Sequence, residues 1–160
     1  MSEDLVDRIS RARKETDESE SRRQALALLR SSAVEQNGDF AWSEIINSAR
    51  VLIEKYNKTF PGTAPVAMSV KPGSPPQGFD VNCPLFPIAT LAVWKNSPHF
   101  FEFSAMRASA SFGPEENDSG RIDIVADDNR NISFITRDGP KPTAQDVAEF
   151  LLEALLNMRP

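Results

Sequence analysis

The 160-residue sequence has few of the residue types that most often build catalytic or metal centres. It holds one cysteine, Cys83, and one histidine, His99. A lone cysteine excludes an intramolecular disulfide, and one residue of each type cannot supply the cysteine and histidine ligands of a zinc site. Any Ser-His-Asp or Cys-His arrangement would have to use His99, and no strand-to-helix nucleophile turn surrounds Cys83. We therefore expect neither a catalytic residue nor a metal site.

Other absences narrow the class of protein further. The seven glycines are scattered singly, so the dinucleotide- and phosphate-binding glycine patterns do not occur and no cofactor is expected. No apolar run approaches the roughly 18 residues of a membrane span. The first residues lack the basic and apolar regions of a secretory signal. These features predict a cytoplasmic protein that does not bind a membrane.

The charge balance argues against nucleic acid as a partner. The chain carries 18 basic and 23 acidic side chains, a formal net charge of −5. Binding to phosphates needs clustered Lys and Arg, and the basic cluster at Arg8–Lys14 is cancelled by the acidic residues that follow it. We expect no binding of nucleic acid.

The length and the 40% hydrophobic content are typical of one globular domain. Residues 1–24 have helical composition, but Ala12 is the one apolar side chain between Ser10 and Gln24, which is too little to dock that stretch. We predict a charged N-terminal helical arm over 1–24, with docking from about Leu26, and a single α+β domain over 25–160.

A second N-terminal helix is predicted after Asn37-Gly38, because glycine commonly ends a helix and Asp39 can cap the next one. The residues that follow form one apolar stripe at helical spacing. Its members are Trp42, Ile45, Ile46, Ala49, Leu52, Ile53 and Tyr56.

The middle of the chain predicts an antiparallel sheet of about four to six strands, arranged as a meander of hairpins. Prolines between Thr59 and Ile88 disfavour central strands there, although the alternation over 66–70 suits an edge strand. Further strands are predicted from Ile88 to Trp94 and from Phe100 to Phe112. The apolar parity changes within the second of these, which predicts a β-bulge near Met106 and Arg107.

The segment Gly113–Gly120 is acidic and rich in turn residues, and we predict a loop. The strongest hairpin signal follows, over 121–136, with its turn at 126–130. Asp127, Asn129 and Asn131 share the oxygen spacing of a calcium loop, but the glycine and glutamate that such a loop needs are missing. Turn chemistry is therefore the preferred interpretation. Asp138-Gly139-Pro140 is predicted to end the sheet.

A C-terminal amphipathic helix is predicted to pack on the sheet. Thr143 and Asp146 have the spacing of a capping box, and Val147, Phe150, Leu151, Ala154, Leu155 and Met158 form a stripe. Leu152 and Leu156 widen that stripe beyond what one sheet face usually covers. Either an N-terminal helix of the same chain or a second subunit should lie against them.

Two interpretations of function follow. In size, acidity and fold class the chain resembles small secretion chaperones, which implies a non-enzymatic protein-interaction, adaptor or chaperone-like module that binds a protein partner or self-associates. Its candidate surface comprises Trp94, His99, Phe100, Leu152 and Leu156. The alternative is a small-molecule-binding protein or enzyme with a pocket near His99 and the proline-rich segment.

Overall fold

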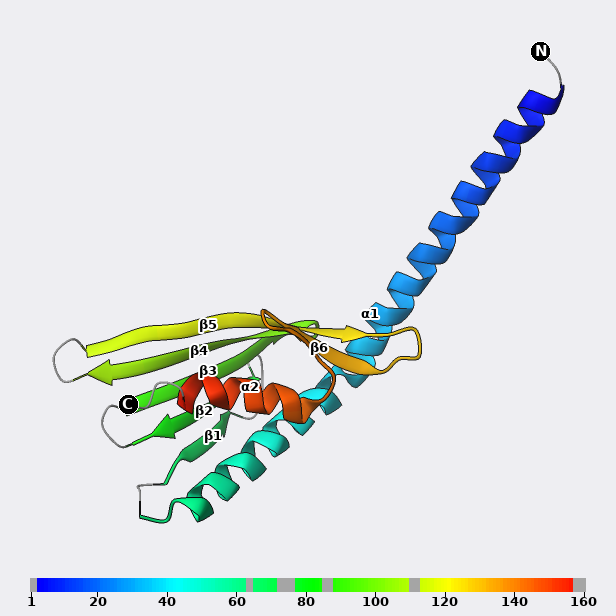
Figure 1. Ribbon diagram of the computed structural model, residues 1–160. Helices are drawn as coiled ribbons and strands as arrows, with labels where there is room; N and C mark the ends of the chain where they lie inside the picture. The colour runs from blue at the N-terminus through cyan, green and yellow to red at the C-terminus, as the bar shows by residue number, and fades with distance from the viewer. Residues whose placement is uncertain (1–2, 63–64, 72–76, 85–87, 110–112, 157–160) are drawn as a thin grey trace.

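The computed structural model describes residues 3–62, 65–71, 77–84, 88–109 and 113–156 (Figure 1). The architecture is α+β: one long N-terminal helix, an antiparallel sheet, and a C-terminal helix that packs on both. The helices are α1 (Glu3–Thr59) and α2 (Ala144–Leu156). The strands are β1 (Ala67–Lys71), β2 (Gln77–Cys83), β3 (Ile88–Ser97), β4 (Phe100–Ser109), β5 (Gly113–Ala126), β6 (Ile132–Thr136) and β7 (Gly139–Lys141).

The prediction of two N-terminal helices is wrong, because α1 runs through Asn37-Gly38 without a break. Gly38 lies on the buried face of the helix, one turn from both Val34 and Trp42, so the apolar stripe keeps its phase across it. A Cβ at this position would lie 3.3 Å from the carbonyl oxygen of Pro98. Glycine therefore permits close approach of the β3–β4 turn instead of ending the helix.

Asp39 does not cap a helix either. It lies inside α1 and accepts a hydrogen bond of 2.9 Å from the Nζ of Lys95 in β3. The side chain of Lys95 is buried, with 5% of its surface exposed, whereas the carboxylate of Asp39 is largely exposed. The pair joins the middle of α1 to the sheet.

The sheet is a seven-stranded meander in which every strand pairs with its sequence neighbours, in the order β1 to β7. Seven strands exceed the four to six predicted, partly because the short strand β7 pairs with β6 where the sheet was expected to end. The edge position of β1 and the β5–β6 hairpin are confirmed.

The predicted loop at Gly113–Gly120 is also wrong, because these residues form the first half of β5 and pair with β4. Their polar composition disfavours a strand, but pairing along a neighbouring strand overrides that preference. The pairing of β4 with β5 shifts between Ala105 and Met106, where the register skips Asn117.

A bulge next to Met106 is therefore confirmed, but the prediction placed it in the wrong strand. The pairing of β4 with β3 runs unbroken from Glu102 to Ala108, so the extra residue belongs to β5. Phe112, which contributed to the prediction, lies outside the described residues.

The hydrophobic core lies between one face of the sheet and the two helices. The ring of Trp42 in α1 lies 5.8 Å from that of Phe79 and 5.3 Å from that of Phe101. Phe150 of α2 meets Phe103 edge-on at 5.7 Å. All three phenylalanines of the sheet belong to the same face, so both helices cover that face.

Local chemistry at α2 agrees with the sequence. Thr143 Oγ1 accepts from the backbone N–H of Asp146, and the Asp146 carboxylate accepts from the backbone N–H of Thr143, both at 3.2 Å. The capping box is confirmed. No helix in the described part of the chain has an apolar stretch long enough to cross a membrane.

Candidate interaction surfaces

The N-terminal half of α1 projects away from the sheet (Figure 1). Every described side chain from Val6 to Arg30 is exposed, and the first buried side chain of the helix is Ala33, at 1%. Docking therefore begins about two turns later than Leu26. We call the segment Glu3–Leu29 the arm; at 1.5 Å per residue it is about 40 Å long.

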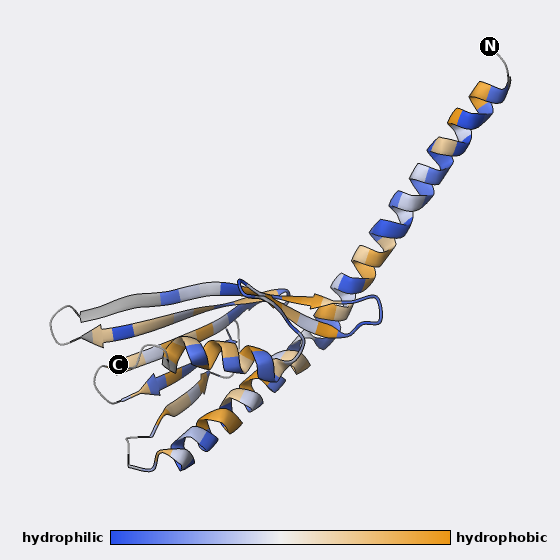
Figure 2. Cartoon of the chain, in the orientation of Figure 1, coloured by the Kyte–Doolittle hydropathy of each residue, from blue (hydrophilic) through white to orange (hydrophobic). Residues whose placement is uncertain are grey.

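The apolar residues of the arm gather near its tip and near its base, with more polar residues between them (Figure 2). At the tip Val6 is 56% exposed, and at the base Leu28 is 71% exposed. The other large apolar side chains exposed on the arm are Ile9, Leu26 and Leu29. A helix that packed only on its own domain would turn such residues toward the core, so these two patches suit contact with another molecule.

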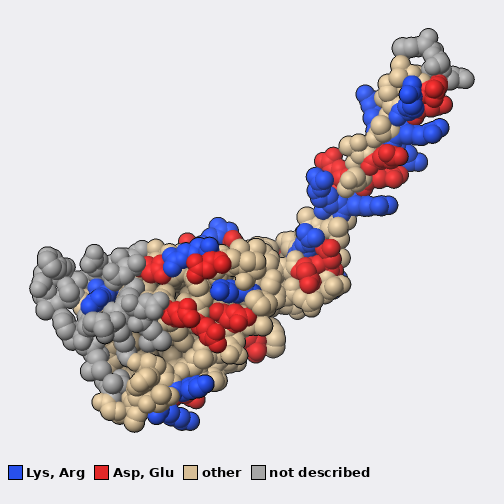
Figure 3. Space-filling view, viewed as in Figure 1, with Lys and Arg blue, Asp and Glu red and all other residues tan. Residues whose placement is uncertain are grey.

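Charges on the arm alternate in blocks along its length (Figure 3). Residues 1–7 carry three acidic side chains and residues 8–14 four basic ones; residues 15–21 carry four acidic and residues 22–28 two basic ones. No block contains a charge of the opposite sign. The surface of the arm thus has a marked charge pattern although its net charge is small.

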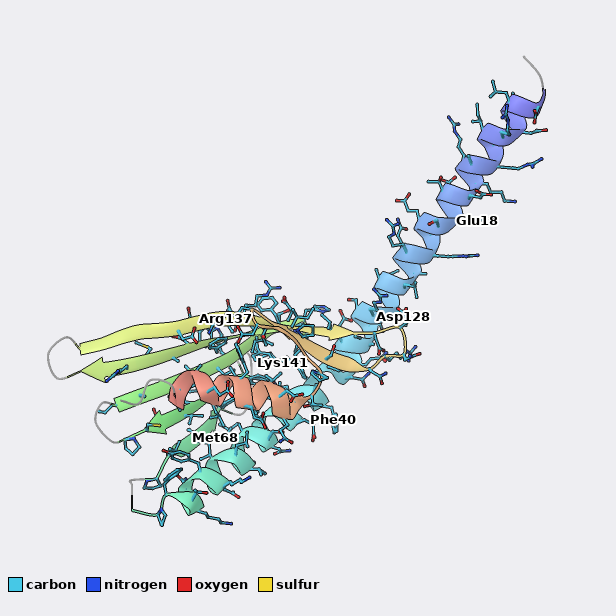
Figure 4. All side chains as sticks on the ribbon, in the orientation of Figure 1. Glu18, Phe40, Met68, Asp128, Arg137 and Lys141 are labelled. Carbon is cyan, nitrogen blue, oxygen red and sulfur yellow. The ribbon has the colours of Figure 1, made fainter. Side chains whose placement is uncertain are left out.

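Just after the arm, α1 is fixed to the sheet by two ion pairs and by a contact between His99 and Glu35. Arg30 donates to the carboxylate of Asp128, in the β5–β6 turn, through Nη2 at 2.6 Å and Nε at 2.9 Å. Asp128 lies beside α1 at this point (Figure 4). The Nε2 of His99 lies 3.7 Å from the Oε1 of Glu35. With the Lys95 and Asp39 pair, these contacts set the direction in which the arm leaves the body.

The turn that holds Asp128 is built as the hairpin prediction requires. One oxygen of Asp127 accepts from the backbone N–H groups of Asn129 and Asn131, at 2.8 and 2.9 Å. The pKa of Asp127 is held below its usual value, and the main cause is the hydrogen bond from the backbone N–H of Asn131. Arg130 adopts a positive φ of 65°, which closes the turn.

The candidates Trp94 and Phe100 lie on the sheet face opposite the helices. Trp94 Nε1 donates to Glu102 at 3.1 Å, and the guanidinium of Arg121 lies 3.8 Å above the ring of Phe100. Phe101 is fully buried on the other face, which confirms that the two adjacent phenylalanines point to opposite sides. The aromatic rings of this open face are thus covered in part by charged side chains.

His99 and Cys83 do not form one site. Cys83 pairs with Ala89 at one end of β3, whereas His99 follows Ser97 at the other end. The rise of about 3.3 Å per residue puts roughly 26 Å between these ends. Burial raises the pKa of the Cys83 thiol, which makes it less reactive. The described residues contain no group of three or more His, Cys, Asp and Glu placed to hold a metal ion.

A groove of about 330 Å³ lies between the end of α1 and α2. Its lining is mainly apolar, and its charged side chains are Lys55, Glu149 and Glu153. The remaining lining residues are Leu52, Ile53, Tyr56, Thr59, Phe60, Val66, Leu152 and Leu155. Leu152 is 8% exposed because α1 packs against α2, so the same-chain explanation for the wide stripe is confirmed. The side chain of Leu156 lies outside the described residues.

Sequence reasoning missed the contacts that orient the arm. Arg30 and Asp128 are 98 residues apart, and Asp39 and Lys95 are 56 apart, so no local pattern pairs them. It also treated the apolar residues near Leu26 as docked on the core, whereas they are exposed. Comparison with protein-family models, with curated proteins and with solved structures finds no significant match.

Proposed function

We propose that this protein is a non-enzymatic interaction module, an adaptor whose arm binds a protein partner while the α+β body anchors it. The observation that carries the proposal is the arm itself. It extends about 40 Å from the body and exposes apolar patches at both ends.

Two physical points support a protein as the partner. Most of the stability of a helix in a protein comes from packing of an apolar face, and five large apolar side chains of the arm are exposed. Alternating charge blocks also suit a surface of matching pattern better than a uniformly negative polymer or membrane. A cytoplasmic location, as the composition predicts, is part of the proposal.

Site-specific photo-crosslinking in cells tests the proposal. A photoreactive residue at Ile9, which is 48% exposed, should give discrete protein adducts, because that side chain faces the bound partner. The matched control is Val51, which is 63% exposed on the same helix but lies alongside the body. Adduct yields at Ile9 no higher than at Val51 would contradict the proposal.

A second candidate is binding of an apolar small molecule in the groove between α1 and α2. The groove volume and its mostly apolar lining favour it. It lies apart from His99, so it does not support the pocket expected there. Leu152→Trp should fill the groove and abolish binding of an apolar fluorescent probe; unchanged probe binding would reject this candidate.

A further inference from the structure

The charge blocks of the arm match those of a second copy of the arm that runs antiparallel to it. Reversing the direction of the arm about a point between Lys14 and Glu15 places the basic block 8–14 beside the acidic block 15–21. The same operation places the acidic block 1–7 beside the basic block 22–28. A second copy of the arm, running antiparallel, therefore meets opposite charge along its whole length.

A stripe of apolar and small side chains has nearly the same centre of symmetry. The residues Leu5, Ile9, Ala12, Thr16, Ser19 and Leu26 recur at three-, four- and seven-residue steps and fall within an arc of about 100°. Antiparallel pairing centred on Lys14 brings Ile9 opposite Ser19 and Ala12 opposite Thr16. Charge and side-chain size, two separate properties of the sequence, thus both favour an antiparallel pair, with centres that differ by half a residue.

The middle of the stripe suits close contact between helices. Ala12, Thr16 and Ser19 are small, and the Thr16 hydroxyl donates to the carbonyl oxygen of Ala12 at 2.8 Å. Thr16 can therefore face a second helix without leaving its donor unpaired. Leu5, Ile9 and Leu26 are the larger apolar side chains of the stripe and lie toward its two ends.

Parallel arrangements fit less well. In register, a parallel pair sets the basic block 8–14 beside itself, and like charges at that distance repel. A parallel pair staggered by seven residues restores opposite signs, but it leaves blocks at each end to bind further copies. Such a head-to-tail contact does not close, whereas the antiparallel pair is a closed two-fold dimer.

We propose that the partner of the arm is the arm of a second copy of this chain, in an antiparallel dimer that overlaps residues 3–26. This proposal builds on the proposed function, since it names the occupant of the same surface. The overlap is about 36 Å long, and the two bodies lie at its opposite ends. Every side chain from Val6 to Leu26 is exposed, so the body leaves room for a second helix.

Charge reversal in the full-length chain tests the pairing. In sedimentation velocity the dimer fraction of the wild type should rise with protein concentration. It should fall as salt is added, because salt screens the charge blocks. The fourfold variant Arg8→Glu, Arg11→Glu, Arg13→Glu and Lys14→Glu should lose about a hundredfold or more in affinity. Adding Glu15→Lys, Asp17→Lys, Glu18→Lys and Glu20→Lys should restore dimerisation, because the blocks then match again with their signs exchanged.

Disulfide trapping tests the orientation. Chains carrying Ile9→Cys should crosslink with chains carrying Ser19→Cys when the two are mixed, and neither variant should crosslink efficiently by itself. The native Cys83 is 1% exposed and stays out of the reaction. Self-crosslinking by Ile9→Cys alone would overturn the antiparallel arrangement.

The outcomes separate this proposal from the proposed function. A chain that stays monomeric at every concentration, or a fourfold variant that still dimerises, overturns the dimer. If photo-adducts at Ile9 then contain only a different protein, the interaction module stands and the second copy does not. Unchanged thermal unfolding of the body and unchanged helicity show that the variants remain folded.

Discussion

At the scale of single residues, Gly38 shows that a helix-breaking residue can be kept inside a helix for contact. Its missing side chain lets the β3–β4 turn come close to α1. We expect Gly38→Leu to lower the free energy of unfolding by about 1–3 kcal/mol through overpacking. Urea unfolding should measure the loss. The same residue at the exposed neighbouring position, Gln36→Leu, should change stability by no more than about 0.5 kcal/mol.

Asp118 and Arg137 predict a dependence of stability on pH. Arg137 Nη2 donates to the Asp118 carboxylate at 2.6 Å, and this hydrogen bond, chiefly, holds the pKa of Asp118 below its ordinary 3.8. A depressed carboxyl pKa stabilises the fold above the unfolded pKa and stops doing so as pH falls through the folded value. Arg137→Met should therefore lower the urea midpoint at neutral pH.

The measurement compares wild type and Arg137→Met in urea at several pH values. The difference in midpoint should be constant above about pH 5 and shrink as pH falls below 4. Arg137→Lys keeps the charge but loses the bidentate hydrogen bonds, so its urea midpoint should lie between those of the wild type and Arg137→Met. A difference that stays the same down to pH 2 would show that Arg137 acts through packing, for example against Phe150.

At the scale of elements, the capping box of α2 gives a direct test. Thr143→Ala removes the hydroxyl that accepts from the N–H of Asp146, and should cost about 1 kcal/mol in the free energy of unfolding. Thr143→Ser keeps the hydroxyl and should retain most of the stability. Equal losses for the two substitutions would mean that the methyl group of Thr143, and not its hydrogen bond, is what matters.

The sequence predicts elements well where the signal is local. The stripe of α2, the β5–β6 turn and the alternation of β1 each depend on residues a few positions apart. The errors occur where distant contacts decide. Asn37-Gly38 reads as a helix end until the β3–β4 turn is known to pack on it. Gly113–Gly120 reads as a loop until β4 pairs with it.

The candidate surface shows the same division. Alternation along β4 places Phe100 on the face opposite Phe101, so part of the open sheet face follows from the sequence. The poor apolar stripe before Leu26 likewise predicts that the first residues do not dock. The direction of the arm does not follow, because it depends on Arg30 meeting Asp128 and on Lys95 meeting Asp39 across the fold.

At the scale of the whole molecule, the arm and the body should be separable in stability. Deleting residues 1–24 removes no side chain that the structure describes as buried, so the free energy of unfolding should change by no more than about 0.5 kcal/mol at a concentration where chains do not associate. Deleting 1–36 also removes the buried Ala33 and Val34. That loss should cost about 2 kcal/mol or more in urea unfolding. Equal stability of the two truncated chains would contradict the boundary at Ala33.

The unbroken course of α1 has a mechanical consequence. One rod has its lower half in the core beside Trp42 and its upper half in solvent, with no linker between them. A partner bound at the tip is therefore held in a fixed orientation relative to the open face of the sheet, and the partner and the body rotate in solution as one particle. A force applied at the tip is transmitted along the helix to the core around Trp42.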